Sequence, residues 1–498
     1  MVRMLLTLVL VWSTIVGLVA QQPAAGTAPP KRLVSVKTSG ELTAALKAAQ
    51  DGWTIEAEPG VLYVGAFVAP QLRPGARATL RVRGVLEDRR VSPKDNGRLA
   101  TLRAPAGAVS LTVWGGWTVD GFKFESDGNA FGLVRVGSAE GYASAADVPQ
   151  HVELRRFVID VPADKQERRG VMVHGGHVTL RQCWISGIKE ADYGDTQAVA
   201  GWDLPGPVTV QDCRLEAAGE VVIFGGADPS IKGMTPTDIK ILDNDITRPM
   251  EWRGKWQVKN LLELKHARNV LVRGNRFSNN WASAQGGWAF VFTPANQNGG
   301  CPWCVVEDVV FERNVATNIG NGFNILGFEA KVGFVSGGTR NITIRNNLLL
   351  IDGAGLGGDG RVLQLLDGRL SDLTFDHNTA IADGTFINLD TYGKGKFKGV
   401  VVTNNLAKHN LYGIFGTAVG SGMPAIEAML EKPIFTRNVL AGATQAGYSY
   451  PATTLSPTVA TFNSEFNPDW TLKASSSWKS SGTDGKDLGS EPFGASAK

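Results

Sequence analysis

The feature that most constrains the fold is a short phrase that recurs along the chain in a fixed frame. Each copy alternates apolar and polar residues, as in "NVLVRGN" (residues 269–275), and ends in asparagine. Successive copies lie 31, 39, 33, 31, 27 and 33 residues apart and end at Asn244, Asn275, Asn314, Asn347, Asn378, Asn405 and Asn438. A repeat of this size is typical of a stacked, solenoid architecture.

Each repeat unit also contains a second apolar stretch, such as "FNILG" (323–327), and none shows helical periodicity. The unit is therefore predicted to be one coil of an all-β solenoid, with equivalent residues of neighbouring coils stacked about 4.8 Å apart. Asparagine tolerates the left-handed backbone of a sharp turn, and its amide can hydrogen-bond to the copies above and below. An internal asparagine ladder is expected, continued in the upstream coils by Phe122, Phe157, Cys183 and Cys213.

These repeats resemble those of the pectin-lyase-like superfamily, over roughly residues 35–450. The resemblance extends to "SGELTAALKA" (residues 39–48), which is similar to the family's amphipathic capping helix, with Ser39 as the expected N-cap. It implies an all-β, single-stranded right-handed parallel β-helix of about 10–12 coils with an N-terminal capping helix. The superfamily includes polysaccharide lyases, hydrolases, esterases, epimerases and phage tailspikes, whose sites lie in a groove on one outer sheet face. Function therefore has to be argued from the site itself.

The N-terminus has the order of a secretory signal: Arg3, then an apolar run from Met4 to about Ala20, then small and polar residues. We assign residues 1–22 to a signal peptide, 23–35 to a linker, 36–446 to the β-helix and 447–498 to a C-terminal tail that is packed on the solenoid or partly disordered. This predicts a secreted or periplasmic protein that is not membrane-bound after cleavage. An uncleaved anchor is the alternative, although the run is short for a span.

Charge and cysteine content narrow the function classes. The net charge is +3, from 50 basic and 47 acidic residues, which gives no case for a nucleic-acid partner. Cys301 and Cys304 form "CPWC" in a glycine-rich loop, where a local disulfide is favoured over a redox or zinc site. Cys183 and Cys213 stand one coil apart at the same ladder position, as stacked free thiols or as a disulfide.

Two adjacent coils concentrate tryptophan and positive charge. Flat aromatic rings stack on sugar faces, and cations pair with uronate carboxylates, so this material suits an anionic polysaccharide. The predicted substrate-binding residues in these coils are Arg253, Trp252, Trp256, Trp281 and Trp288. The structural alternative is that individual tryptophans pack against the outside of the solenoid.

Strand periodicity places further residues on the same outer face. If Leu262 and Leu264 point inward, Glu263 and Lys265 point outward. The equivalent outward positions of later coils complete the predicted substrate-binding strip: Thr293, Asn324, Gln364 and Asn388.

The predicted catalytic residues are Lys259, Glu263, Lys265, Asp228 and Glu220. In a lyase, carboxylates hold Ca²⁺ against the substrate's acid group while a lysine removes the α-proton. In a hydrolase, one carboxyl group protonates the leaving oxygen while another activates water or attacks. No metal-ligand set is assigned, and Ca²⁺ is the candidate cofactor. Solvated surface charge and ion pairs between neighbours are the structural alternative.

The sequence thus predicts an exported carbohydrate-active protein that binds and cleaves an acidic, uronate-containing polysaccharide, with β-elimination slightly favoured over hydrolysis. The alternative is a non-catalytic surface or glycan-binding β-helix. It is favoured by the absence of the "NTD" and "RIK" phrases of polygalacturonase-like hydrolases and of the "DPHE" phrase of alginate epimerases. The oligomeric state is left open.

Overall fold

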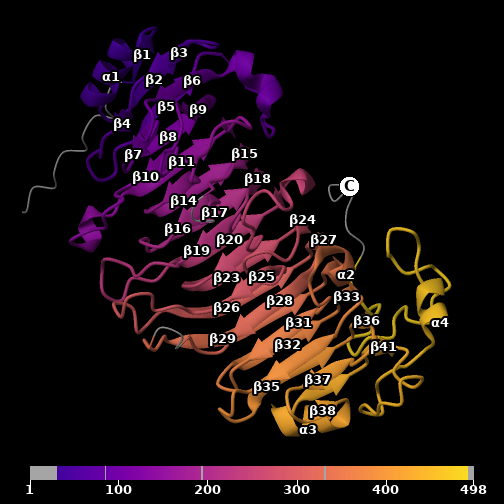
Figure 1. The fold of residues 1–498 in the computed structure, drawn as a ribbon. Coiled ribbons are helices and arrows are strands. Elements are labelled where there is room, and N and C mark those ends of the chain that lie inside the picture. The colour runs from indigo at the N-terminus through magenta and orange to yellow at the C-terminus, as the bar shows by residue number, and fades with distance from the viewer. Residues whose placement is uncertain (1–30, 85, 192–194, 330–332, 492–498) are drawn as a thin grey trace, which may run out of the picture.

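The computed structural model describes residues 31–84, 86–191, 195–329 and 333–491. The chain winds through three long sheets in turn, so that each coil adds a strand to each sheet (Figure 1). Every pairing between the named strands is parallel except that of β37 with β38. The protein is a single-stranded right-handed parallel β-helix, as predicted.

The first sheet, called sheet A here, carries the repeated phrase. In order, its strands are β1 (Arg32–Val36), β2 (Trp53–Ala57), β5 (Ala78–Val82), β8 (Trp117–Asp120), β11 (Gln150–Arg155), β14 (Gly176–Arg181), β17 (Val208–Gln211), β20 (Thr237–Leu242), β23 (Ala267–Arg273), β26 (Val305–Glu312), β29 (Gly338–Arg345), β32 (Ser371–Asp376), β35 (Phe397–Thr403) and β39 (Leu430–Glu431), with β40 (Ile434–Thr436) also paired to β35.

Sheet B follows the ladder turn. Its strands are β3 (Leu62–Val64), β6 (Ala100–Ala104), β9 (Phe122–Ser126), β12 (Val158–Asp160), β15 (Trp184–Ile188), β18 (Arg214–Ala217), β21 (Asp245–Thr247), β24 (Arg276–Asn280), β27 (Val315–Ile319), β30 (Leu348–Ile351), β33 (Thr379–Ile381), β36 (Leu406–Lys408) and β41 (Val439–Ala441). These 13 strands slightly exceed the expected number of coils, because the first coils lack the repeated phrase.

Sheet C completes each coil and carries the candidate site. Its strands are β4 (Phe67–Ala69), β7 (Leu111–Val113), β10 (Val134–Val136), β13 (Arg169–Val173), β16 (Gln197–Gly201), β19 (Val222–Phe224), β22 (Leu262–Leu264), β25 (Trp288–Phe292), β28 (Asn321–Leu326), β31 (Leu363–Leu366), β34 (Ile387–Asp390), β37 (Ile414–Gly416) and β38 (Gly420–Ser421).

The repeated asparagines form the predicted internal ladder. Asn314 Oδ1 accepts hydrogen bonds from the backbone N–H and the side-chain amide of Asn275, at 2.9 and 3.0 Å. Upstream, the backbone N–H of Cys213 donates to Asn244 Oδ1, and that of Cys183 donates to the Cys213 sulfur. Each rung therefore satisfies buried polar groups of the next coil, which the apolar interior requires.

The ladder asparagine itself is predicted to adopt the left-handed backbone of the turn. In the structure, the residue before it does so instead. Asp243, Arg313 and Asn346 have φ of 55°, 53° and 54°, and each directly precedes a rung. The asparagine is thus placed by its amide, whose donor and acceptor both find partners. The left-handed backbone of the turn is adopted by the residue that precedes the asparagine.

The interior between the three sheets is apolar and stacked coil on coil. The rings of Phe277, Phe290, Phe311 and Phe323 lie with neighbouring centroids 4.6–5.6 Å apart, within the favourable range for aromatic pairs. This packing supports the strands of sheet C from inside, so that their outward side chains stand on a rigid surface.

Helix α1 (Ser39–Ala48) covers the first coils, with Leu42, Ala45 and Leu46 buried. Its N-cap is Thr38 rather than the predicted Ser39, because Thr38 forms a capping box with Glu41. The Ser39 hydroxyl instead accepts the backbone N–H of Val64 at 2.8 Å.

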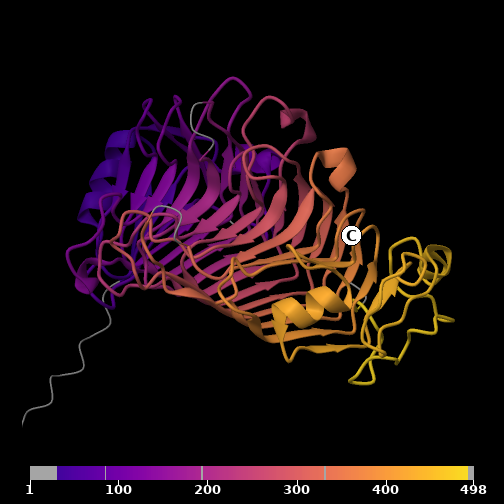
Figure 2. The same cartoon turned by 60° about the horizontal axis from the view of Figure 1, so that its bottom comes forward.

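Helix α3 (Met423–Met429) covers the opposite end of the solenoid with Ala425, Ile426 and Met429 (Figure 2). The remaining helices are short: α2 (Gly353–Leu356), α4 (Val459–Ser464) and the 3₁₀ turns η1 (Pro93–Arg98), η2 (Ala145–Asp147) and η3 (Met250–Trp252). Both open ends of the sheets are therefore protected.

The C-terminal tail lies beside the last coils (Figure 1). Its apolar side chains form a cluster with residues of β36 and β41: Phe462, Phe466, Trp478 and Leu488 from the tail, and Leu406, Val439 and Ala441 from the solenoid. Over its described part the tail is packed on the solenoid, one of the two expected arrangements.

At the N-terminus, residues 1–22, predicted to be a signal peptide, lie outside the described residues. Strand β1 begins at Arg32, inside the segment 23–35 predicted to be a linker, so the β-helix starts a few residues earlier than expected. Among the described residues no helix has the length and apolar character needed to span a bilayer.

The cysteines divide as two pairs. Cys301 and Cys304 form the predicted local disulfide, with a Cα–Cα distance of 5.3 Å. Cys183 and Cys213 are buried free thiols of the ladder column.

Candidate functional site

The outer face of sheet C presents one column of residues in register. From β19 to β34 the column runs through Ile223, Glu263, Val291, Asn324, Gln364 and Asn388. The predicted strip of Asn324, Gln364 and Asn388 is thus confirmed as a column. Thr293 is not part of it, because Val291 occupies the position beside Glu263; Thr293 follows the end of β25 and donates its N–H to Leu264.

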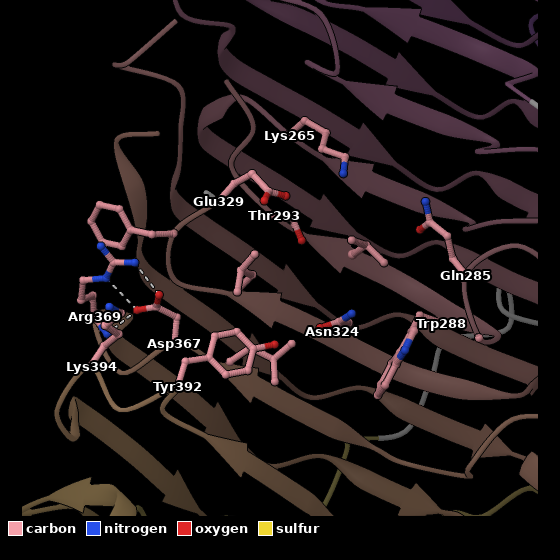
Figure 3. Close-up of a pocket in the computed structure, with 15 residues that line it drawn as sticks. Lys265, Gln285, Trp288, Thr293, Asn324, Glu329, Asp367, Arg369, Tyr392 and Lys394 are labelled. Carbon is pink, nitrogen blue, oxygen red and sulfur yellow. Dashed lines mark hydrogen bonds and ion pairs between the residues drawn. The ribbon is translucent and has the colours of Figure 1, made fainter. Parts of the chain in front are cut away.

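Two adjoining cavities run along this face. One, of about 760 Å³, lies over β25, β28 and β31 (Figure 3). In that view the rings of Trp288 and Tyr392 stand on either side of Asn324. The other, of about 410 Å³, lies over β13, β16, β19 and β22. Lys265 and Gln285 line both cavities, so the two form one groove.

A cluster of four charged side chains lies where the cavities meet. Glu263, on β22, is only 1% exposed, and Lys265 Nζ lies 3.0 Å from its carboxylate. Glu220 is buried and pairs with Lys259 at 3.0 Å. These predicted catalytic residues, separated by up to 45 positions, are brought together because each lies in or beside one of the neighbouring strands β19 and β22 of sheet C.

Neighbouring side chains hold this cluster in place. Gln197 Nε2 donates to Glu220 Oε2 at 2.7 Å, and Lys259 also pairs with Asp195. Buried Arg248 donates to the backbone carbonyls of Gly219 and Asn260, which directly precede Glu220 and follow Lys259. The backbone next to Glu220 and Lys259 is therefore held in place by the Arg248 side chain.

The electrostatics assign different protonation states to the acids and bases. Burial raises the pKa of Glu220 to about 7, and the charge of Glu263 adds to the rise. Burial alone would lower the pKa of Lys259, but Glu220 and Asp195 outweigh it and raise that pKa. The pKa of Lys265 is likewise raised by Glu263 against the effect of burial. Both lysines are therefore protonated at neutral pH, contrary to the expected role of a lysine base.

Asp228 is placed outside this cluster. Its carboxylate accepts three backbone N–H groups, from Gln297, Asn298 and Gly300, at 2.7–2.9 Å. The side chain thus shapes the loop that carries Gln297 to the groove wall, and its predicted catalytic role is not supported.

The predicted tryptophan platform is also largely wrong. Trp252 and Trp281 are buried in a cluster of their own with Val258 and Leu356, and Trp256 packs against it. Arg253 lies at the same place and donates to the Gly355 carbonyl at 2.8 Å. These residues hold the long insertions together, whereas Trp288 alone of the predicted tryptophans lines the groove.

Several groove residues were missed from the sequence. The smaller cavity is also lined by Phe131, Arg169, Gln197 and Trp202, and the larger by Tyr392. Arg169 and Gln197 are register partners on neighbouring coils, and they occupy positions equivalent to that of Glu220 on the coil that follows. Aligning the sheet C stretches of the upstream coils on Glu220 would have found both.

The sequence matches no protein-family model and no curated protein. Among solved structures, the chain is similar to the PL6 family alginate lyase AlyGC, with a TM-score of 0.51 and 15% identity, over 93% of this chain and 58% of that one. The likeness shows that the two chains share the parallel β-helix fold.

This β-helix is also similar to the PL6 family polysaccharide lyase Pedsa3628 from Pseudopedobacter saltans, with a TM-score of 0.47 and 14% identity, over 92% of this chain and 100% of that one. Its likeness to the Streptococcus pneumoniae adhesin PfbA has a TM-score of 0.43 and 10% identity, over 84% of this chain and 94% of that one. At such identities the likeness shows the fold and not the reaction.

The groove cluster offers oxygen donors for a hard cation. Among the described residues, none donates a hydrogen bond to the buried atoms Glu263 Oε2 and Gln197 Oε1, whereas Glu263 Oε1 lies 3.0 Å from Lys265 Nζ. Carboxylate and amide oxygens are the ligands that Ca²⁺ prefers. By contrast, His266, Cys301 and Cys304 lie within 4.8 Å of one another but do not form a metal site, because both sulfurs are in the disulfide and both ring nitrogens of His266 have partners.

Proposed function

We propose that this β-helix is an exported enzyme that cleaves an acidic polysaccharide by β-elimination in the sheet C groove. The observation that carries the proposal is the cluster of the buried Glu220 and Glu263 with Lys259 and Lys265 in the middle of a long open groove. A buried carboxylate oxygen without a hydrogen-bond partner, such as Glu263 Oε2, costs stability, and strongly perturbed pKa values are typical of functional sites.

The protonation states suit elimination next to a uronate carboxyl group. Glu220, with a pKa of about 7, takes the proton from the carbon that bears the carboxyl group. The electron pair of that C–H bond forms a C=C bond, and the C–O bond to the leaving sugar breaks. Protonated Lys265, which lines both cavities, returns a proton to the leaving oxygen. Exchange with water then restores both side chains.

The negative charge of the substrate has to be offset at the same time. Lys259 and Lys265 supply two positive charges beside Glu220 and Glu263. Glu263 and Gln197 would hold Ca²⁺, and a bound Ca²⁺ would supply further neutralisation of the uronate carboxylate. The lyase activity named for AlyGC, the structure with a TM-score of 0.51, agrees with this assignment.

The test is an elimination assay on the mature protein. Alginate, polygalacturonate and glycosaminoglycans are offered in turn, with and without Ca²⁺, while the ultraviolet absorbance of the new conjugated double bond is followed. We expect absorbance to rise with at least one uronate polymer. Glu220→Gln and Lys265→Met should each abolish the rise, while Glu251→Gln, at an exposed carboxylate outside the groove, leaves it unchanged.

Two other results would change the assignment. New reducing ends without ultraviolet absorbance would mean hydrolysis in the same groove. Saturable binding without any product would identify a non-catalytic glycan-binding β-helix and overturn the proposal.

A further inference from the structure

The groove contains a buried arginine that its neighbours leave unpaired. Arg169 is the first residue of β13 and is 8% exposed. Its guanidinium lies over the ring of Phe131 at 4.4 Å and near that of Trp202 at 5.4 Å. Among the described residues none accepts a hydrogen bond from its Nε or Nη1 atoms. A guanidinium in such a setting lacks the partner that buried charges normally have.

The nearby carboxylates are already engaged elsewhere. Asp195 pairs with Lys259, and Glu220 pairs with Lys259 and Gln197. Burial and, to a smaller extent, the neighbouring charge of Arg168 lower the pKa of Arg169 to about 10, yet the guanidinium still carries its charge at neutral pH. The positive charge is therefore available to an anion that enters the smaller cavity, which Arg169 lines.

The surroundings select the kind of anion. A guanidinium presents parallel N–H groups that match the two oxygens of a carboxylate. Phe131 is 45% exposed and offers a flat apolar face beside it, and Trp202 lines the same cavity. A planar cation next to aromatic faces suits a sugar ring that bears a carboxylate, because the ring stacks while the acid pairs.

The position of Arg169 relates it to the catalytic cluster. Arg169 is the register partner of Gln197, and Gln197 donates to Glu220 on the following coil. Two strand spacings separate Arg169 from Glu220, or about 10 Å along the solenoid axis. That separation exceeds one hydrogen bond, so the two side chains contact different sugar units of a chain that lies along the groove.

We propose that Arg169, with Phe131 and Trp202, forms a subsite that binds the carboxylate of a uronate unit next to the one that is cleaved. The inference rests on the proposed function for its substrate class, but the subsite requires only binding. In this proposal, the end of the groove nearest β10 recognises the negative charge of the polymer.

The experiment measures binding and cleavage separately. Calorimetry of the mature protein with oligosaccharides of alginate and polygalacturonate, and with the same sugars after reduction of their carboxyl groups, gives Kd without reference to catalysis. We expect Arg169→Gln to weaken binding of the acidic oligosaccharides about tenfold or more and Arg169→Lys to weaken it less. Carboxyl-reduced sugars should bind weakly to both variants and to the native protein.

Two further variants keep the test decisive. Phe131→Ala, at an exposed side chain that will not impair folding, should also weaken binding even if Arg169→Gln fails to fold. Arg253→Lys, in the insertion outside both cavities, is the matched control and should bind like the native protein.

The outcomes separate this subsite from the proposed reaction. Native affinity in both Arg169→Gln and Phe131→Ala, or equal binding of the carboxyl-reduced sugars, would overturn the subsite even if the enzyme cleaves uronates. Conversely, loss of affinity in both variants with no product from the native protein would support the subsite and reject the reaction.

Discussion

The carboxyl group of Glu220 changes its protonation near neutral pH because the fold removes it from water and places Glu263 nearby. Lys259 opposes this effect without cancelling it. A carboxyl group poised in this way is an effective proton acceptor at the pH where it also remains partly protonated. Its ordinary counterparts on the surface titrate far lower.

We expect the pH–rate profile to report this group. Because the proposed elimination needs deprotonated Glu220, its kcat/KM should rise about tenfold per pH unit below about pH 7 and level off above it. Initial rates from about pH 5 to about pH 8 measure this. A flat profile over that range would remove Glu220 from the role of base.

Folding stability should respond to pH in the opposite direction. The pKa of Glu220 is 4.5 in the unfolded chain and about 7 in the fold, so the folded state binds more protons between these values. The contribution is fully present below pH 4.5 and is lost as the pH rises through about 7, by about 3 kcal/mol in all.

Denaturant titrations at several pH values, on the native protein and on Glu220→Gln, check this expectation. The difference in unfolding free energy between the two proteins should change over that window. A constant difference would mean that Glu220 keeps its ordinary pKa in the fold.

At the scale of elements, the ladder joins coils that share little sequence. The Asn314 side chain satisfies the backbone N–H of Asn275 and the Val272 carbonyl and also contacts Asn347. Each of these groups is buried, so a missing rung leaves donors and acceptors without partners. Leaving such buried groups without partners lowers the stability of the fold, whereas a surface asparagine contributes little to stability.

We therefore expect Asn314→Ala to lower the free energy of unfolding by about 3 kcal/mol. Asn298→Ala, at an exposed loop position, should change it by less than about 0.5 kcal/mol. Denaturant midpoints of both variants provide the measurement. Equal midpoints would show that the ladder contributes specificity of register rather than stability.

Strand elements were also the part of the structure that the sequence predicted best. The fixed frame of the asparagines revealed the coils, and alternation around Glu263 placed it and Lys265 on the outer face. Alternation says nothing about the long insertions, so the sequence predicts Trp252 and Trp281 in the groove although both are buried in an apolar cluster outside it. Arg169 lies in a coil without a ladder asparagine, where no repeated residue marked the frame.

At the scale of the whole molecule, one apolar cluster packs the tail on the solenoid, beside polar contacts such as those of Thr483 with Asn404 and of Ser490 with Thr379. Phe462 is fully buried there against Phe466 and Trp478, while Val459 of the same helix is 42% exposed. The remaining coils have their own continuous core. The tail should therefore be able to detach while the solenoid stays folded.

Phe462→Ala should release the tail, since a buried phenylalanine contributes about 3–5 kcal/mol. Limited proteolysis should then cleave within residues 447–491 and leave a resistant solenoid fragment. Val459→Ala, the matched control, should be cleaved no faster than the native protein. Simultaneous loss of the solenoid would mean that the tail is an integral part of the fold.

The stacked coils also set the length of the groove in fixed steps. Every coil adds one step of about 4.8 Å to sheet C and contributes its own outward residue. Duplication or loss of a whole coil would therefore lengthen or shorten the substrate path by a fixed increment without disturbing the chemistry elsewhere. In the polysaccharide groove proposed above, the length of the bound chain would therefore change in steps of one coil.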